Sequence, residues 1–124
     1  MSKIYWGVHQ IINARGCSIP AISSRSTLLA FNARLIGDIG MVAYGDPFLQ
    51  SFGEKHLKGY TLIQPIHTSS ITCHFAEETG DAYLDIFSCK NFNPETVKLV
   101  IQDYFKPIQI DSKVIWRQAG IRME

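Results

Sequence analysis

Residues 67–89, HTSSITCHFAEETGDAYLDIFSC, decide the fold of this chain. Residues 69–75 alternate polar and apolar side chains, which is the period of a strand with one buried face. Residues 77–81 supply a turn, in which Gly80 readily adopts a positive φ. Residues 82–89 predict the next strand. The stretch therefore predicts a β-hairpin, and it is unusually rich in serine, histidine, glutamate and cysteine side chains that can do chemistry.

The chain before this hairpin predicts a strand, a helix and a long loop. Residues 3–13 mix β-branched and aromatic side chains in alternation, as strands do. Glycine and proline mark residues 14–22 as a loop, and residues 24–36 then carry apolar side chains at helical spacing. Residues 40–45 predict a short strand. The polar, glycine-punctuated residues 46–59 predict a loop, and loops of this length are often functional.

The remaining segments add further strands and a second helix. Residues 60–66 are strand-like and lead into the hairpin. After the hairpin, Asn93 is a suitable N-cap and Pro94 a suitable first residue for a helix with one apolar stripe. Residues 108–111 and 113–118 predict two more strands. The order β-α-β-β-β-β-α-β-β predicts a mixed or antiparallel sheet with its helices on one face.

Length and composition limit the class of protein. The 124 residues, 46% of them hydrophobic, fit one domain over residues 1–124. A net charge of +1 without a basic stripe argues against nucleic acid as the main partner. We find neither a signal peptide nor an apolar run of roughly 18 residues, so we expect a cytoplasmic protein that does not contact a membrane.

Three residues of the hairpin region are candidates for chemistry: Ser69 begins a strand, His74 lies on a strand face with two hydroxyl residues, and Cys89 ends a strand. Each residue alone also has a structural explanation, namely a loop-ending serine, a hydrogen-bonded histidine and a small buried hydrophobe. Cys17, Cys73 and Cys89 are an odd number at wide spacings, which fits neither a disulfide framework nor a zinc site. We therefore expect reduced thiols and no metal.

The joint spacing of these residues resembles the small bacterial, archaeal and virus-encoded S-adenosylmethionine decarboxylase proenzymes, which are pyruvoyl-dependent. A typical family segment reads S-H-[IL]-[ST]-I-H-T-W-P-E and, after a short turn, A-x-[VL]-D-[IVL]-[FY]-[ST]-C. The counterparts here are residues 69–78, SSITCHFAEE, and residues 82–89, AYLDIFSC. The five-residue step from Ser69 to His74 and the fifteen-residue step from His74 to Cys89 match without a gap.

The resemblance implies an α+β fold, a two-layer α/β sandwich, in a chain that cuts itself. The cut falls between Thr68 and Ser69 and leaves a β chain of residues 1–68 and an α chain of residues 69–124. In this family the serine hydroxyl attacks the preceding carbonyl carbon, and β-elimination then converts the serine into a pyruvoyl group. Ser69 is thus implied to be the precursor of a covalent pyruvoyl cofactor.

The resemblance also implies roles for four other residues. His74 would remove the Ser69 α-proton during processing, and Thr61 would assist. The pyruvoyl ketone would form a Schiff base with the substrate amine and withdraw electrons as carbon dioxide leaves. Cys89 would return the proton, which suits a thiol because ordinary thiols are mostly protonated at neutral pH. Glu78 would bind the ribose of the nucleoside.

The sequence departs from the family where the substrate would bind. The family's Trp-Pro is Ala76-Glu77 here, so Phe75, or Phe52 in the long loop, would have to supply the stacking surface for adenine. The residue before the cleaved bond is Thr68, where the family usually has glutamate. The processing residues are therefore kept better than those that would recognise adenosine.

Three functions follow from these observations. The first is decarboxylation of S-adenosylmethionine for spermidine and polyamine synthesis, in a homodimer whose active sites lie near the dimer interface. The second keeps the chemistry but acts on arginine or ornithine, because the Trp-Pro pair is missing. The third is an unprocessed, non-catalytic regulatory homologue, which Thr68 and the altered pocket motivate.

Overall fold

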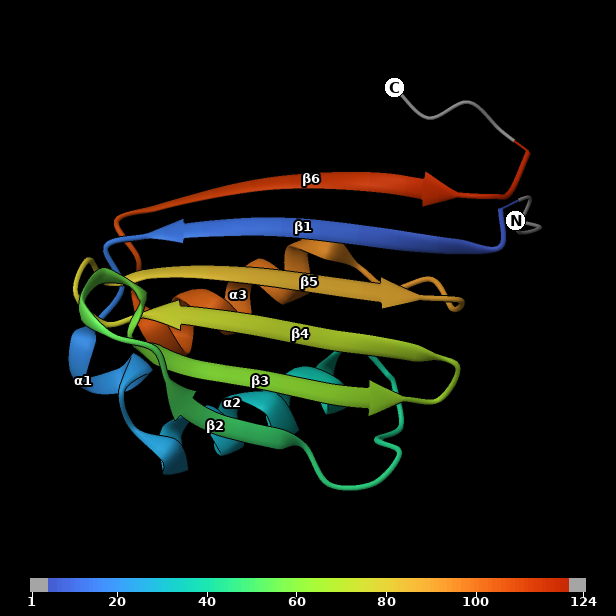
Figure 1. Ribbon diagram of the computed structural model, residues 1–124. Coiled ribbons are helices and arrows are strands. Elements are labelled where there is room, and N and C mark those ends of the chain that lie inside the picture. Colours follow the sequence, from blue (N-terminus) through green and yellow to red (C-terminus); the bar gives the residue numbers. More distant parts are fainter. Residues whose placement is uncertain (1–4, 121–124) are drawn as a thin grey trace.

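The structure is a computed structural model, and it describes residues 5–120 (Figure 1). Its strands form one sheet in the order β2-β3-β4-β5-β1-β6, and every pairing in it is antiparallel. The strands are β1 (Gly7–Arg15), β2 (Phe48–Phe52), β3 (Gly59–Ile66), β4 (Ser69–Ala76), β5 (Asp81–Ser88) and β6 (Gln109–Arg117).

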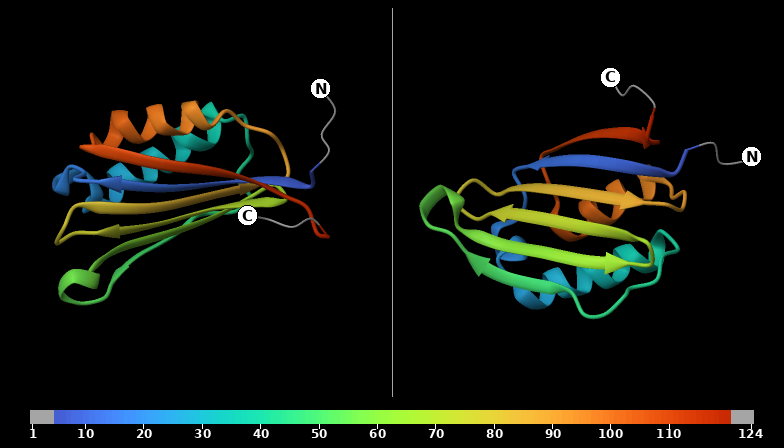
Figure 2. Two further views of the ribbon diagram at one scale, coloured as in Figure 1. Left: turned by 90° about the horizontal axis from the view of Figure 1, so that it is seen from above. Right: turned by 45° about the vertical axis from the view of Figure 1, so that its right-hand side comes forward.

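The helices lie together on one face of this sheet, as the left view of Figure 2 shows. They are α1 (Ile19–Ile22), α2 (Arg25–Asp38) and α3 (Pro94–Phe105), with a short 3-10 helix η1 (Lys55–Leu57) between β2 and β3. Ser24 and Asn93 cap α2 and α3, because their side chains accept hydrogen bonds from the first backbone N–H groups. The predicted α+β two-layer architecture is confirmed.

The core lies between the helices and the sheet. Strand alternation sends every second side chain of β1, β4 and β5 into this layer, where Ile12, Ile71 and Ile86 meet the rings of Phe31 and Phe105 from the helices. The opposite face of the sheet, which we call the open face, is not covered by any element in the described part of the chain. The sheet therefore presents one whole face on which a site or a partner can be built.

Several predicted boundaries are corrected by the structure. The strand predicted over residues 3–13 is β1, Gly7–Arg15, and residues 3 and 4 lie outside the described residues. The predicted strand over residues 40–45 reduces to a single bridge between Ala43 and Ile66. The two strands predicted over residues 108–118 are one continuous strand, β6.

Two segments predicted as loops contain regular structure. Residues 14–22 include the single turn of α1, and residues 46–59 hold β2 and η1. The sequence of β2 shows no hydrophobic alternation, because β2 is the edge strand of the sheet and buries only Leu49. The long loop of the prediction is therefore mostly an edge strand and a helical turn.

Candidate active site

The turn between β3 and β4 brings the first candidate residues together. Ile66 pairs with Ser69, so His67 and Thr68 alone form the loop, and Thr68 has a φ of +59°. Ser69 Oγ accepts a 2.9 Å hydrogen bond from the backbone N–H of Cys89, and Thr68 Oγ1 contacts Cys89 Sγ. We call Thr68, Ser69 and Cys89 the turn cluster. It joins the predicted cut site directly to the predicted proton donor.

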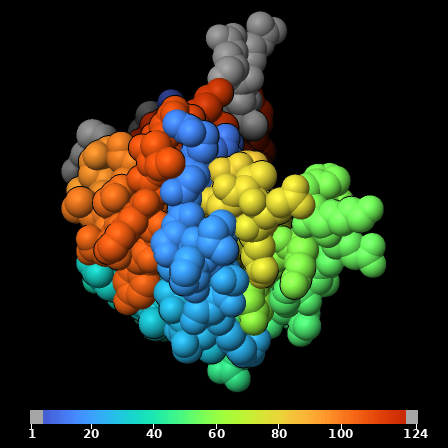
Figure 3. Space-filling model, turned by 90° about the vertical axis from the view of Figure 1, so that its left-hand side faces the viewer, coloured from blue at the N-terminus to red at the C-terminus, as the bar shows by residue number. Residues whose placement is uncertain are grey.

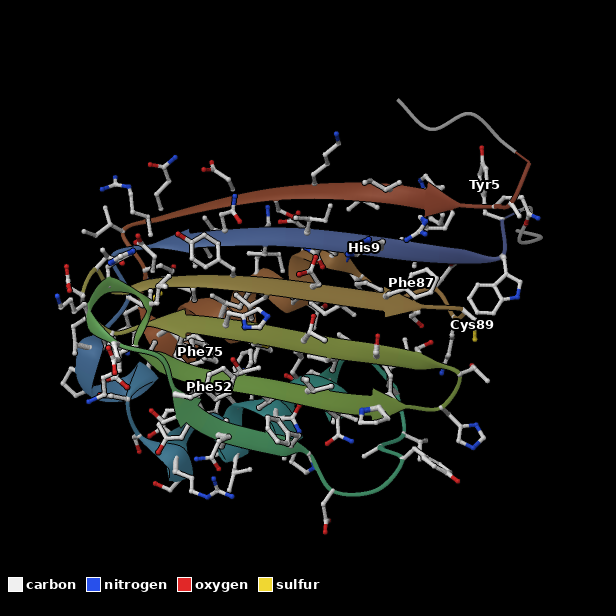
Figure 4. All side chains as sticks on the ribbon, in the orientation of Figure 1. Tyr5, His9, Phe52, Phe75, Phe87 and Cys89 are labelled. Atoms are coloured by element: carbon white, nitrogen blue, oxygen red, sulfur yellow. The ribbon has the colours of Figure 1, made fainter. Side chains whose placement is uncertain are left out.

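An aromatic pair lies at the same end of the sheet, where β1 begins and β5 ends. The Trp6 ring stacks on Phe87 at a centroid distance of 5.7 Å, and the Arg117 guanidinium lies 5.0 Å from the Phe87 centroid. On the same face, His9 Nε2 lies 2.9 Å from Asp85 Oδ1. Figure 4 shows His9, Phe87 and Cys89 following one another toward this end. No motif in the sequence predicts a role for these residues, although alternation in both strands places His9, Asp85 and Phe87 on one face.

The second cluster lies at the other end of β4. Thr61 and His74 face each other across β3 and β4, with Thr61 Oγ1 3.0 Å from His74 Nδ1. They line a cavity of about 430 Å³ whose walls include Phe52 and Tyr83. We call this cavity the His74 pocket. Figure 3 looks at this end of the molecule, where the region around η1 and the turn before β5 project beside one another.

The two clusters are far apart within one chain. Ser69 and His74 are five residues apart on a single strand, which at a rise of about 3.4 Å per residue separates them by roughly 17 Å. An odd separation also directs their side chains to opposite faces of the sheet. The structure therefore joins Ser69 with Cys89 and Thr61 with His74, but it does not join the two pairs in one protomer.

Comparison with known proteins gives the same answer as the hairpin motif. The model of the S-adenosylmethionine decarboxylase family matches residues 8–118. The chain belongs to the S-adenosylmethionine decarboxylase family. A search of the curated proteins found no match. The family resemblance of the sequence is thereby confirmed over almost the whole chain.

A solved structure supports the fold of this family member. The crystal structure of the adenosylmethionine decarboxylase from Aquifex aeolicus VF5 superposes with a TM-score of 0.78, covering 97% of each chain at 17% sequence identity. At 17% identity, this similarity shows that the two chains share a fold. In the described residues, no helix is long and apolar enough to span a membrane.

The two aromatic residues proposed to stack on a nucleoside both line the His74 pocket, but they differ in exposure. Phe75 is only 3% exposed, and its ring lies 5.4 Å from Phe105 in the core. Phe52 is 54% exposed at the His74 pocket, so it alone offers an open ring face. Glu78 is exposed in the turn before β5, at the same end of the sheet. The candidate substrate residues of this family member thus gather around His74 and not around Ser69.

The three cysteines differ sharply in their surroundings. Burial, and secondly the charge of Asp81, raises the pKa of the Cys17 thiol to about 11. Burial, with the charge of Asp85, raises the pKa of the Cys73 thiol further. Cys89 is only half-buried, and no disulfide joins any of the three. Cys89 is therefore the most accessible of the three thiols.

Proposed function

We propose that this protein is a self-processing, pyruvoyl-dependent decarboxylase that converts S-adenosylmethionine to its decarboxylated form for spermidine and polyamine synthesis. The observation that carries the proposal is the turn cluster, in which Ser69, the residue after the bond to be cut, is hydrogen-bonded to Cys89. Family membership supports the reaction class. Three reduced thiols are consistent with a cytoplasmic location.

The residues of the turn cluster fit a pyruvoyl group derived from Ser69. The Ser69 hydroxyl accepts a hydrogen bond from the backbone N–H of Cys89, which fixes the orientation of the hydroxyl that would attack the Thr68 carbonyl carbon. The Thr68–Ser69 bond joins the two-residue loop to the first residue of β4. Cutting this bond therefore leaves Ser69 as the first residue of the strand. When formed, the ketone would act as an electron sink for decarboxylation. Cys89 is then close enough to donate a proton to the substrate carbon.

Processing by His74 requires a second protomer. The separation of about 17 Å in one chain rules out direct proton transfer from Ser69 to His74 of the same chain. The two clusters lie at opposite ends of β4, so a two-fold arrangement of two protomers would bring the His74 pocket of one chain to the end of the sheet that holds the turn cluster of the other. Exposed apolar side chains on the open face, including Phe52, Ile63 and Tyr83, support such a homodimer.

The His74 pocket of the partner would then receive the nucleoside. Its volume of about 430 Å³ is in the range of small-molecule sites. Phe52 would stack on the adenine, and the carboxylate of Glu78 would accept hydrogen bonds from the ribose hydroxyls. Thr61 lies against His74 Nδ1 and would fix the orientation of that imidazole ring.

Intact mass spectrometry tests the proposal. Two fragments that meet at Thr68–Ser69 are expected in place of the 14.0 kDa chain, and Ser69→Ala should leave one uncut species. Carbon dioxide release from S-adenosylmethionine should accompany the cut protein. A single uncut wild-type species would instead support a non-catalytic regulatory homologue, which is the function that Thr68 and the altered pocket favour.

A second candidate keeps the chemistry and changes the substrate to arginine or ornithine. It is favoured by Ala76 and Glu77, which stand where the family has Trp-Pro. Ala76 lines the His74 pocket, and Glu77 follows it at the end of β4. Glu77 could pair with a basic side chain in place of a purine. Release of carbon dioxide from arginine or ornithine, but not from S-adenosylmethionine, would select this candidate.

A further inference from the structure

Thr68 has an unusual backbone conformation. Three non-glycine residues in the described part of the chain have a positive φ: Lys55, Thr68 and Lys106. Lys106 is the C-cap of α3, where the left-handed conformation is common, and Lys55 opens η1. Thr68 is the only β-branched residue of the three, and a β-branched side chain at positive φ is a genuine steric outlier.

The geometry of the turn does not favour threonine at position 68. A two-residue hairpin loop with positive φ at its second residue is normally built with glycine or asparagine there. Threonine adds a branched carbon that crowds its own backbone in this conformation. Threonine therefore occupies a positive-φ position that normally takes glycine or asparagine, and its carbonyl belongs to the proposed cut site. Such unfavourable backbone conformations concentrate at functional sites.

Surrounding contacts hold the strained residue in place. The backbone N–H of His67 donates to the Val42 carbonyl oxygen at 3.0 Å, which anchors the loop to the segment after α2. Thr68 Oγ1 donates to the His67 carbonyl oxygen at 2.6 Å and contacts Cys89 Sγ. Strain persists only where the rest of the structure fixes it, and these contacts supply that fixation from two sides.

We propose that Thr68 is a positioning residue for self-cleavage, whose strained left-handed backbone raises the free energy of the uncut chain and so accelerates its own cleavage. This inference rests on the proposed function. As Ser69 Oγ bonds to the Thr68 carbonyl carbon, the Thr68–Ser69 C–N bond breaks and the hydroxyl proton passes to the nitrogen. Elimination then breaks the Ser69 Cα–H bond, whose proton passes to the processing base, and the Ser69 Cβ–Oγ bond, which releases Thr68 as a carboxylate that is free to leave the left-handed region. The dehydroalanine left at position 69 tautomerises to an imine, and water hydrolyses this imine to the pyruvoyl ketone with release of ammonia.

The strain can be removed without removing the cut bond. Thr68→Gly and Thr68→Asn keep the turn but accept a positive φ more easily. Thr68→Val keeps the branched carbon and loses the hydroxyl, so it separates strain from the contacts of Thr68 Oγ1. Lys106→Gly relieves a positive φ at the C-cap of α3, far from the turn, and serves as the matched control.

The first measurement is the rate of cutting, followed by intact mass after cell-free synthesis of each chain. We expect Thr68→Gly to be cut about five- to thirtyfold more slowly than wild type, which corresponds to about 1–2 kcal/mol. The cutting rate of Thr68→Asn should lie between those of Thr68→Gly and wild type. Thr68→Val should be cut faster than Thr68→Gly, and Lys106→Gly should be cut at the wild-type rate. A Thr68→Gly chain cut as fast as wild type, or a Thr68→Val chain as slow as Thr68→Gly, would overturn the inference.

The second measurement is thermal unfolding in the Ser69→Ala background, where no cutting occurs. Relief of strain predicts that Thr68→Asn raises the unfolding midpoint while Thr68→Val does not. A variant that is more stable yet slower to cut cannot be explained by a folding defect, and a lowered midpoint for Thr68→Asn would refute the strain. Failure of the proposed function is distinct, because wild type would then not be cut at all.

Discussion

At the scale of single residues, Phe52 and Phe48 differ in one respect that matters. Both rings are about half exposed on edge strand β2, and they lie four residues apart on the same face. Only Phe52 lines the His74 pocket. We therefore assign the adenine contact to Phe52, and Phe48 provides a control of the same size, strand and exposure.

We predict that Phe52→Ala raises KM for S-adenosylmethionine about two- to tenfold with little change in kcat, because a stacked aromatic pair contributes about 0.5–1.5 kcal/mol. Phe48→Ala should leave both constants near wild type. Steady-state release of carbon dioxide measures both variants. Equal effects of the two substitutions would show that Phe52 acts through β2 and not through the substrate.

The thiols give a second prediction at this scale. Labelling requires the thiolate, and the raised pKa of Cys17, about 11, leaves almost none of it ionised at pH 8. The buried Cys73 is shielded further. In the Ser69→Ala chain, iodoacetamide at pH 8 should modify only Cys89, and all three thiols should react after denaturation. Labelling of Cys17 should grow as the pH approaches 11, and rapid labelling of Cys73 in the folded chain would contradict its burial.

At the scale of elements, β3 and β4 approach each other closely beside the His74 pocket. A Cβ atom added at Gly59 would lie 1.6 Å from the Phe75 carbonyl oxygen, a backbone atom that cannot turn aside. The start of β3 must therefore be glycine if Thr61 is to stay paired with His74.

We predict that Gly59→Ala lowers the free energy of unfolding and separates the two strands near His74. Gly37→Ala is the matched control, because a Cβ atom there meets nothing within 4 Å and Gly37 lies in α2. That substitution should stabilise the chain by about 0.5–1 kcal/mol. Urea unfolding of both variants in the Ser69→Ala background measures the difference, and equal stability of the two would contradict the close approach.

The elements also show what sequence patterns could predict. The β4–β5 hairpin was predicted to within a residue at each end because its alternation is clean and its turn contains Gly80. The edge strand β2 was missed because it buries one side chain, Leu49, and so carries no alternating pattern. The motif spacing singled out Ser69, His74 and Cys89 together. The structure joins Ser69 to Cys89, but five residues along one strand keep Ser69 away from His74.

At the scale of the whole molecule, the distance between the turn cluster and the His74 pocket determines how many chains an active site needs. The turn cluster and the His74 pocket lie at opposite ends of one strand, and the open face between them is uncovered in the described chain. Two protomers related by a two-fold axis across that face would form two complete sites. Each site would take Ser69 and Cys89 from one chain and Thr61 and His74 from the other.

This arrangement predicts complementation between two inactive chains. Ser69→Ala and His74→Ala should each remain uncut when expressed alone. When they are expressed together, random pairing should leave about half of the His74→Ala chains in mixed dimers, where the partner's intact histidine allows the cut at Ser69. Intact mass distinguishes the two chains and their fragments.

Two further partner chains make the test specific to the proposed division of the site. A Ser69→Ala/Cys89→Ala partner should rescue the His74→Ala chain as well as Ser69→Ala does, because the partner contributes only its His74 pocket. A Ser69→Ala/Thr61→Val partner should rescue it poorly, because the imidazole loses the hydroxyl that lies 3.0 Å from its Nδ1. If the His74→Ala chain stays uncut with every partner although mixed dimers form, the histidine does not act across the interface. The proposed dimer would then have no role in processing.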